Sequence, residues 1–197
     1  SKPPLLAWTL FLHTSFLGSS FESVKLFPIV FYIFTTIAVY ALCLSLKIKK
    51  TLALLCAFSF FVMPAVSVSS FLISTDVVLL FFWSLSLIMF LRIRNDPSLI
   101  NFVVLGILLG LAFLSKYAAV YFFFCLLVNI IFDKKLKDIW KSNKLNFLIF
   151  VLVVIIVMLP NIYWNAANGW VTFDHTSDNA NFKNINPDLL RGFSFLI

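Results

Sequence analysis

Long apolar runs without charge alternate with short polar gaps along most of this chain. A helix needs about 20 apolar residues to cross the hydrocarbon core of a bilayer, and about 17 are tolerated. The pattern therefore predicts six membrane-spanning helices, at residues 26–46, 52–73, 77–91, 99–115, 117–132 and 145–163. A seventh apolar run begins near Leu189 and is cut off at Ile197.

The fourth and fifth runs form one apolar stretch that only Lys116 interrupts. The whole stretch, residues 99–132, is too long for a single span, so we predict a helical hairpin that turns at Lys116. Gly106 and Gly110 lie about one helical turn apart in the first arm. This spacing favours a close approach to a neighbouring helix.

Basic residues are concentrated in every second polar gap between the apolar runs. Ten of the fifteen Lys and Arg residues lie in the gaps at 47–50, 92–97 and 133–144. The positive-inside rule places these gaps in the cytoplasm. The opposite face then receives residues 1–25, Ser74-Thr75-Asp76, Ser115-Lys116 and the segment 161–188.

These elements predict an all-α, polytopic membrane protein. The expected organisation of residues 1–197 is an outer interfacial segment (1–25), six spans (26–163), an outer loop (164–188) and the start of a further span (189–197). The sequence begins Ser-Lys-Pro-Pro and ends inside an apolar run. We therefore expect a fragment of a longer protein.

Composition supports a membrane protein. Hydrophobic residues make up 62% of the chain, charged residues 12%, and the mean hydropathy is +1.04, whereas soluble domains carry about 25% charged residues. The net charge of +7 lies in the gaps without interleaved exposed aromatics, so it indicates topology and no nucleic-acid partner. The three cysteines lie in apolar runs and indicate neither a disulfide framework nor a metal site.

Two charged residues on the outer face are candidates for chemistry. Asp76 begins a predicted span, where it either caps the helix or acts in a site. Lys116 places a cation in a tight turn on the side that is poor in positive charge. It either extends toward the lipid head groups or binds an anionic group such as a lipid phosphate.

Four further residues are weaker candidates. Lys2 precedes two prolines that stiffen the backbone, although a solvated lysine is the simpler explanation. Trp164 and Asn165 lie at the end of a predicted span, where an aromatic side chain suits the membrane interface. His175 is a loop histidine without a second His or Cys at metal-ligand spacing. No glycine-rich phosphate loop is present in the sequence.

Several of these positions belong to motifs in a characteristic order: Lys2-Pro3-Pro4-Leu5-Leu6-Ala7-Trp8, Ser74-Thr75-Asp76, Gly110-Leu111-Ala112-Phe113-Leu114-Ser115-Lys116-Tyr117, Leu159-Pro160-Asn161-Ile162-Tyr163-Trp164-Asn165 and Trp170-Val171-Thr172-Phe173. Over essentially the whole chain they resemble the bacterial relatives of the dolichyl-phosphate-mannose protein mannosyltransferases. This family has the GT-C fold and includes the lipid A aminoarabinose transferase.

The resemblance implies a glycosyltransferase of the inner membrane with a periplasmic active face. It would transfer a sugar from a polyprenyl (undecaprenyl) phosphate donor to lipopolysaccharide, another glycolipid or a protein. Lys2 and Lys116 would contact the donor phosphate, and Asp76 would be a secondary catalytic carboxylate. The family's main catalytic Asp would precede Ser1.

Other implications of the resemblance are less specific. His175 lies near a histidine of the family, and Trp164 and Asn165 would belong to a substrate loop. The aminoarabinose transferase binds a metal through a histidine and a glutamate, and Ser1 stands at the position of that glutamate. The serine at this position argues against a metal at this site, so no cofactor is assigned and a divalent metal ion is only left open. A transporter, a lipid flippase and a noncatalytic membrane subunit are the alternatives, and neither the sugar nor the acceptor is specified.

Overall fold

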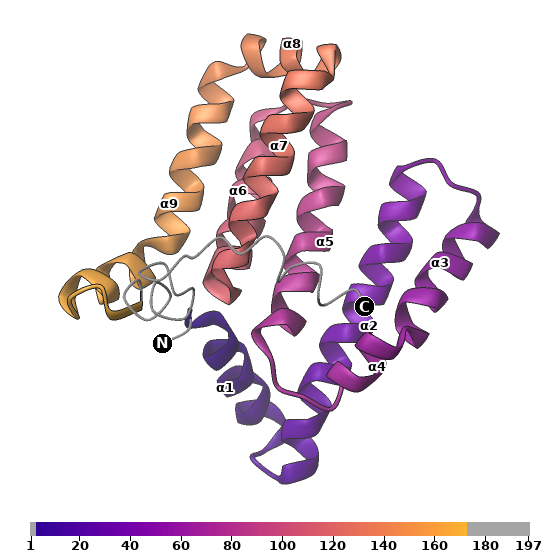
Figure 1. Ribbon diagram of the computed structural model, residues 1–197, viewed down its shortest axis with the longest axis vertical. Coiled ribbons are helices and arrows are strands. Elements are labelled where there is room, and N and C mark those ends of the chain that lie inside the picture. Colours follow the sequence, from indigo (N-terminus) through magenta and orange to yellow (C-terminus); the bar gives the residue numbers. More distant parts are fainter. Residues whose placement is uncertain (1–2, 173–197) are drawn as a thin grey trace, which may run out of the picture. The chain divides into compact units, whose positions relative to one another are not determined.

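The structure, a computed structural model, describes residues 3–172. Their regular elements are all helical, which confirms the predicted all-α class. In chain order (Figure 1) they are α1 (Leu5–Leu17), α2 (Phe21–Ser45), α3 (Lys50–Val62), α4 (Pro64–Ser69), α5 (Thr75–Ile93), α6 (Leu99–Ser115), the 3₁₀ helix η1 (Tyr117–Ala119), α7 (Val120–Phe132), α8 (Lys134–Ser142) and α9 (Lys144–Ala167). Residues 3–161 belong to one compact unit, and residues 162–172 belong to a second unit.

Helix lengths support a multi-pass membrane protein. Within residues 3–172, three helices (α2, α5 and α9) are long and apolar enough to cross a bilayer, and α7 with α8 makes a fourth if the bent pair is one span. At 17 residues α6 is near the lower limit for a span. The membrane architecture is thus confirmed, and the count of six spans stays a prediction.

Two predicted boundaries differ from the structure for local reasons. Helix α2 begins at Phe21, ahead of the apolar run at 26–46, because the Ser20 hydroxyl accepts a hydrogen bond from the Ser23 amide at 3.2 Å. The predicted span at 52–73 is divided at Met63 into α3 and α4. Pro64 has no amide hydrogen to extend α3, and it occupies the first turn of α4, where proline is favoured.

The third basic gap also differs from the expected loop, because it contains helix α8. Asp133 caps this helix: its Oδ1 accepts hydrogen bonds from the amides of Lys135 at 2.9 Å and Leu136 at 3.2 Å. Leu136 and Trp140, one turn apart, are both buried. This helical spacing of apolar residues in a basic segment was the signal that the sequence prediction missed.

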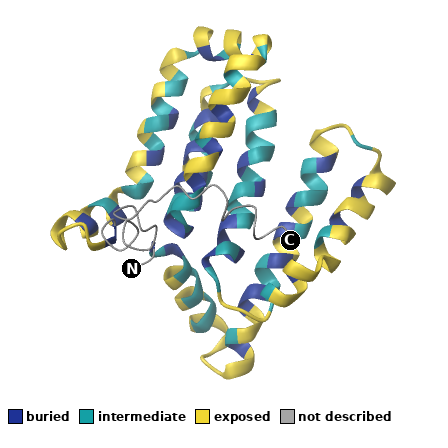
Figure 2. Cartoon of the chain, viewed as in Figure 1, coloured by how far each residue is buried: buried dark blue, intermediate teal, exposed yellow. Residues whose placement is uncertain are grey.

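Helix α6 lies at the centre of the larger core cluster. Its Phe102, Leu105, Leu109 and Ala112 are fully buried, and they pack with residues of α5, α7, α8 and α9. Figure 2 shows the buried positions on the inner faces of these helices and exposed positions on the outer ones. Many large apolar side chains are exposed there, Phe132 by 83%, as expected for a surface that faces lipid.

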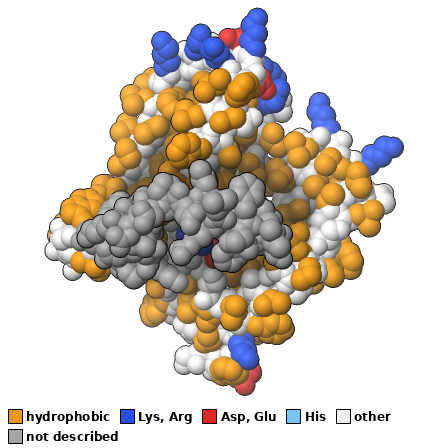
Figure 3. All heavy atoms as spheres, viewed as in Figure 1, with side chains coloured by type: hydrophobic (Ala, Val, Ile, Leu, Met, Phe, Trp, Pro, Cys, Tyr) orange, Lys and Arg blue, Asp and Glu red, His pale blue; other side chains and the backbone are white. Residues whose placement is uncertain are grey.

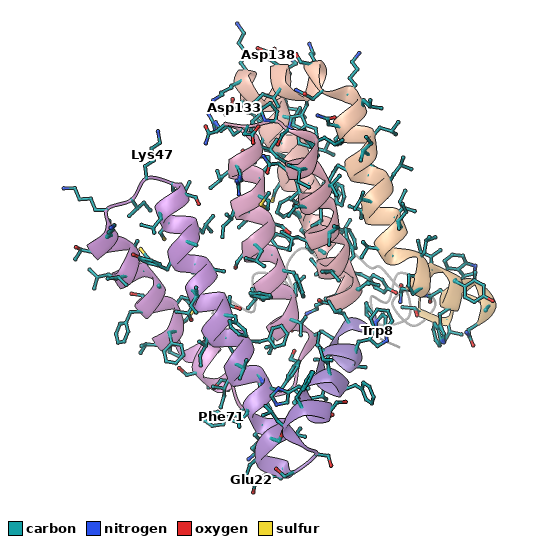
Figure 4. All side chains as sticks on the ribbon, turned by 180° about the vertical axis from the view of Figure 1, so that it is seen from behind. Trp8, Glu22, Lys47, Phe71, Asp133 and Asp138 are labelled. Atoms are coloured by element: carbon teal, nitrogen blue, oxygen red, sulfur yellow. The ribbon has the colours of Figure 1, made fainter. Side chains whose placement is uncertain are left out.

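The two ends of the helices carry different charges. The second and third basic gaps meet at one end, where Arg94 Nη2 lies 2.8 Å from Asp133 Oδ2. Figure 4 places Lys47, from the first basic gap, at this same end, and Glu22 and Phe71 at the other end. The clustering of the basic gaps at one end agrees with the predicted alternation of loops.

Helices α6 and α9 pack at backbone distance, as the glycine spacing predicted. A Cβ atom at Gly106 would lie 2.9 Å from the backbone oxygen of Phe150, and one at Gly110 would lie 2.7 Å from Cβ of Val157. Real Cβ contacts essentially never fall below 3.0 Å. Only glycine at these positions therefore permits this approach.

We expect Gly110→Ala to destabilise the protein by about 1–3 kcal/mol, because the added methyl group overpacks the contact with Val157. Thermal unfolding of the purified protein in detergent measures the loss. The double variant Gly110→Ala/Val157→Ala should recover part of it, because the smaller partner leaves room. An unchanged melting temperature in Gly110→Ala would contradict the close packing.

Candidate functional site

The two strongest candidates from the sequence, Asp76 and Lys116, form an ion pair. Lys116 Nζ donates a hydrogen bond to Asp76 Oδ1 at 2.6 Å, although the two residues are 40 positions apart. Their side chains are 49% and 44% exposed, so both remain accessible to water and to a ligand. A short charge-assisted hydrogen bond of this kind holds both groups in a defined orientation.

The start of α5 positions the Asp76 carboxylate. Ser74 is the N-cap: its backbone is extended, and its hydroxyl oxygen accepts a hydrogen bond from the Asp76 amide at 3.3 Å. The same hydroxyl donates to Asp76 Oδ2 at 3.1 Å. Ser74 therefore performs the capping role considered for Asp76. The Asp76 carboxylate lies in the first turn, where the helix dipole stabilises negative charge.

The turn after α6 positions Lys116. Its backbone is extended, with φ −158° and ψ 136°. Its amide donates to the carbonyl of Ala112 at 3.0 Å, and its carbonyl accepts from the amide of Ala119 at 3.0 Å. These bonds tie the residue to α6 on one side and to η1 on the other. The turn is thus fixed, and the side chain extends to the start of α5.

A second polar contact lies directly beside this turn. The Tyr117 hydroxyl donates a hydrogen bond to Asn161 Oδ1 at 2.8 Å, which links η1 to α9. Asn161 is only 7% exposed. The sequence motifs contain both Tyr117 and Asn161, but neither residue was given a role there. Both are polar residues at the ends of predicted spans, and the loop alternation assigns both ends to the outer face. This placement could have identified them as neighbours.

Of the remaining sequence candidates, two belong to the C-terminal unit and two lie outside the described residues. Trp164 and Asn165 belong to the C-terminal unit; Trp164 is 47% exposed and Asn165 is buried at 1%. Their carbonyls accept hydrogen bonds from the amides of Asn168 at 3.1 Å and Trp170 at 2.8 Å, which close the turn after α9. Lys2 and His175 lie outside the described residues.

No group of three or more His, Cys, Asp or Glu residues suited to a metal ion occurs within residues 3–172. The Asp76 carboxylate is already paired with an ammonium, which repels a metal cation. Ser1 and His175, the positions that concern the metal, lie outside this range. A metal cofactor stays a prediction.

We expect Ser74→Ala to lower the stability by about 1 kcal/mol, because the cap of α5 is lost. Asp76→Asn should cost less, because the asparagine leaves the Ser74 cap in place. Thermal unfolding of both variants in one detergent tests this order. A larger loss for Asp76→Asn would mean that the carboxylate, and not Ser74, secures the start of the helix.

Comparison with known proteins gives the same family as the motif order. The sequence matches the family described as dolichyl-phosphate-mannose-protein mannosyltransferase over residues 1–164. It is 28% identical over 207 residues to the lipid A galacturonosyltransferase RgtD of Rhizobium johnstonii. That alignment covers 99% of this chain and 40% of the relative, so the chain spans about two fifths of the relative's length. No solved structure matches the chain. Residues 1–164 are most of the sequence, and the chain belongs to the dolichyl-phosphate-mannose-protein mannosyltransferase family, within the GT-C superfamily.

Proposed function

We propose that the full-length protein is a membrane glycosyltransferase that moves a sugar from a polyprenyl phosphate to an acceptor at the membrane surface. The observation that carries the proposal is the ion pair between Lys116 and Asp76 at one end of the helices. Family membership supports glycosyl transfer. The name of the relative RgtD makes a lipid A glycolipid the first acceptor to test.

The chemistry requires a fixed cation at the donor phosphate. When the bond between sugar and phosphate breaks, negative charge develops on the leaving phosphate, and an oriented ammonium stabilises it. Lys116 has three N–H donors. One of them binds Asp76, and the others remain to bind phosphate oxygens. Asp76 thus holds Lys116 in place and leaves its other N–H donors available to the phosphate.

The acceptor hydroxyl must also lose a proton to a base. In this proposal the main base is the carboxylate that the family resemblance places before Ser1, and Lys2 is a second contact to the donor phosphate. Asp76 is the secondary carboxylate that orients Lys116. This role requires an anionic Asp76, because a protonated carboxyl would bind the ammonium more weakly.

The position of the pair suits a lipid-linked donor. Asp76 begins α5 and Lys116 ends α6, so both lie at the ends of apolar helices, where a head group meets the protein while its prenyl tail stays in lipid. The basic gaps lie at the other ends of these two helices, where Arg94 meets Asp133. By the positive-inside rule, this arrangement supports a periplasmic location for the proposed site.

Lys116→Ala should reduce sugar transfer at least about tenfold, a loss of about 1.4 kcal/mol in transition-state stabilisation. Transfer from a synthetic polyprenyl-phosphate sugar to lipid A by the full-length protein measures it. Lys25→Ala is the matched control. Lys25 is also exposed, and it packs on the Phe21 ring, with Nζ 4.2 Å from the ring centroid. Equal activity in the two variants would remove Lys116 from the site.

Asp76→Asn should also reduce transfer about tenfold, because Lys116 is no longer held in place. If Asp76 acts through Lys116, the double variant Asp76→Asn/Lys116→Ala should be no slower than Lys116→Ala alone. The same assay with all three variants tests this. A double variant whose loss equals the product of the two single losses would show independent roles.

A further inference from the structure

Helix α8 presents a basic surface at the end of the helices opposite to the ion pair. The segment α7 to α8 bends by 104°, so α8 runs across the direction of α7. Four lysines lie on α8 and a fifth begins α9; all five are exposed: Lys134, Lys135, Lys137, Lys141 and Lys144. Figure 3 shows Lys and Arg side chains gathered over α8.

The apolar side of α8 is anchored in the core. Leu136 is 1% exposed and Trp140 is 6% exposed. The Trp140 ring makes edge-to-face contacts with Phe102 of α6 and Phe147 of α9, at centroid distances of 5.1 and 4.7 Å. Such aromatic contacts add to the burial energy and fix the ring orientation. These contacts fix the orientation of α8, so its lysines stay on the side away from the core.

The lysines of this surface lack carboxylate partners. Within residues 3–172, none of the five forms an ion pair within 4.0 Å. Asp133 is instead paired with Arg94 and bonded to the start of α8. Asp138 is the remaining carboxylate of the helix, so the surface keeps a clear excess of positive charge.

A shallow hollow of about 510 Å³ lies on this surface. Its lining is Lys134, Lys135, Asp138, Ile139, Ser142 and Asn143. Two ammonium groups and a hydroxyl in one hollow are suited to the oxygens of a phosphate. Asp138 is outnumbered by the two lysines, so an anion is still favoured.

The flanks of α8 indicate that this phosphate belongs to a lipid. Phe132 before the helix is 83% exposed, and Leu145 after it is 68% exposed. Side chains of this kind belong in the acyl region of a bilayer, with the adjacent lysines at the level of the head groups. A phospholipid beside α8 can therefore reach the hollow with its head group while its chains contact these apolar residues.

We propose that the hollow on α8 binds the head group of an anionic phospholipid from the leaflet that this end of the protein meets. The site is separate from the glycosyl-transfer site and does not depend on its chemistry. A topology signal requires only that basic residues lie in a cytoplasmic loop. Here the buried Trp140 anchors α8, and Lys134 and Lys135 line one hollow. Binding of this anionic phospholipid would stabilise α8, which connects α7 and α9.

The test uses the full-length protein in nanodiscs of phosphatidylcholine with or without phosphatidylglycerol. Native mass spectrometry measures the bound phosphatidylglycerol. Lys134→Gln/Lys135→Gln should weaken its binding about tenfold or more, because two cations near the surface are lost. Lys134→Arg/Lys135→Arg should keep the binding, which also shows that α8 tolerates substitution there.

The matched control is Lys49→Gln/Lys50→Gln, which removes two adjacent exposed lysines from another basic gap. This control should bind phosphatidylglycerol as the unaltered protein does. Equal weakening in both Gln variants would overturn the proposal, because general charge attraction would then explain the binding. Unchanged binding in the α8 variant would also overturn it. Displacement of the lipid by inorganic phosphate would show that the hollow recognises phosphate alone, and would overturn the lipid assignment.

Discussion

The close contact between α6 and α9 is the constraint on which the described helices depend. Gly106 and Gly110 let the backbones approach to distances that no side chain permits. In lipid, helices gain little from apolar burial against each other, so van der Waals contact at such short distance contributes much of their association. This contact sets α6 in the middle of the core. It thereby determines where both ends of α6 lie.

The two ends of α6 carry different chemistry. At its C-terminus Lys116 reaches Asp76 on α5, and Tyr117 reaches Asn161 on α9. Near its N-terminus Phe102 contacts Trp140, which anchors the basic helix α8. An exposed ion pair adds only about 0–1 kcal/mol to stability. The Lys116–Asp76 pair therefore matters for the orientation of an ammonium, while the packed aromatic residues provide the stability.

Local sequence features explain where the predictions succeeded and where they did not. The run at 99–115 contains no charged residue and no proline, and α6 has the same bounds in the structure. The run at 52–73 contains Pro64, whose effect on hydrogen bonding divides it into α3 and α4. Helix α8 was missed because four lysines hide the spacing of its few apolar residues. Hydropathy alone does not separate a basic loop from a short amphipathic helix.

The sequence by itself determined the helical class, the membrane architecture and the two charged residues worth testing, because apolar length and charge placement act locally along the chain. Only the tertiary structure decided that Asp76 and Lys116 touch and that Tyr117 binds Asn161. Contacts between residues 40 or 44 positions apart depend on how helices pack. Packing depends on the shapes of facing side chains, such as Gly110 against Val157, which no single segment specifies.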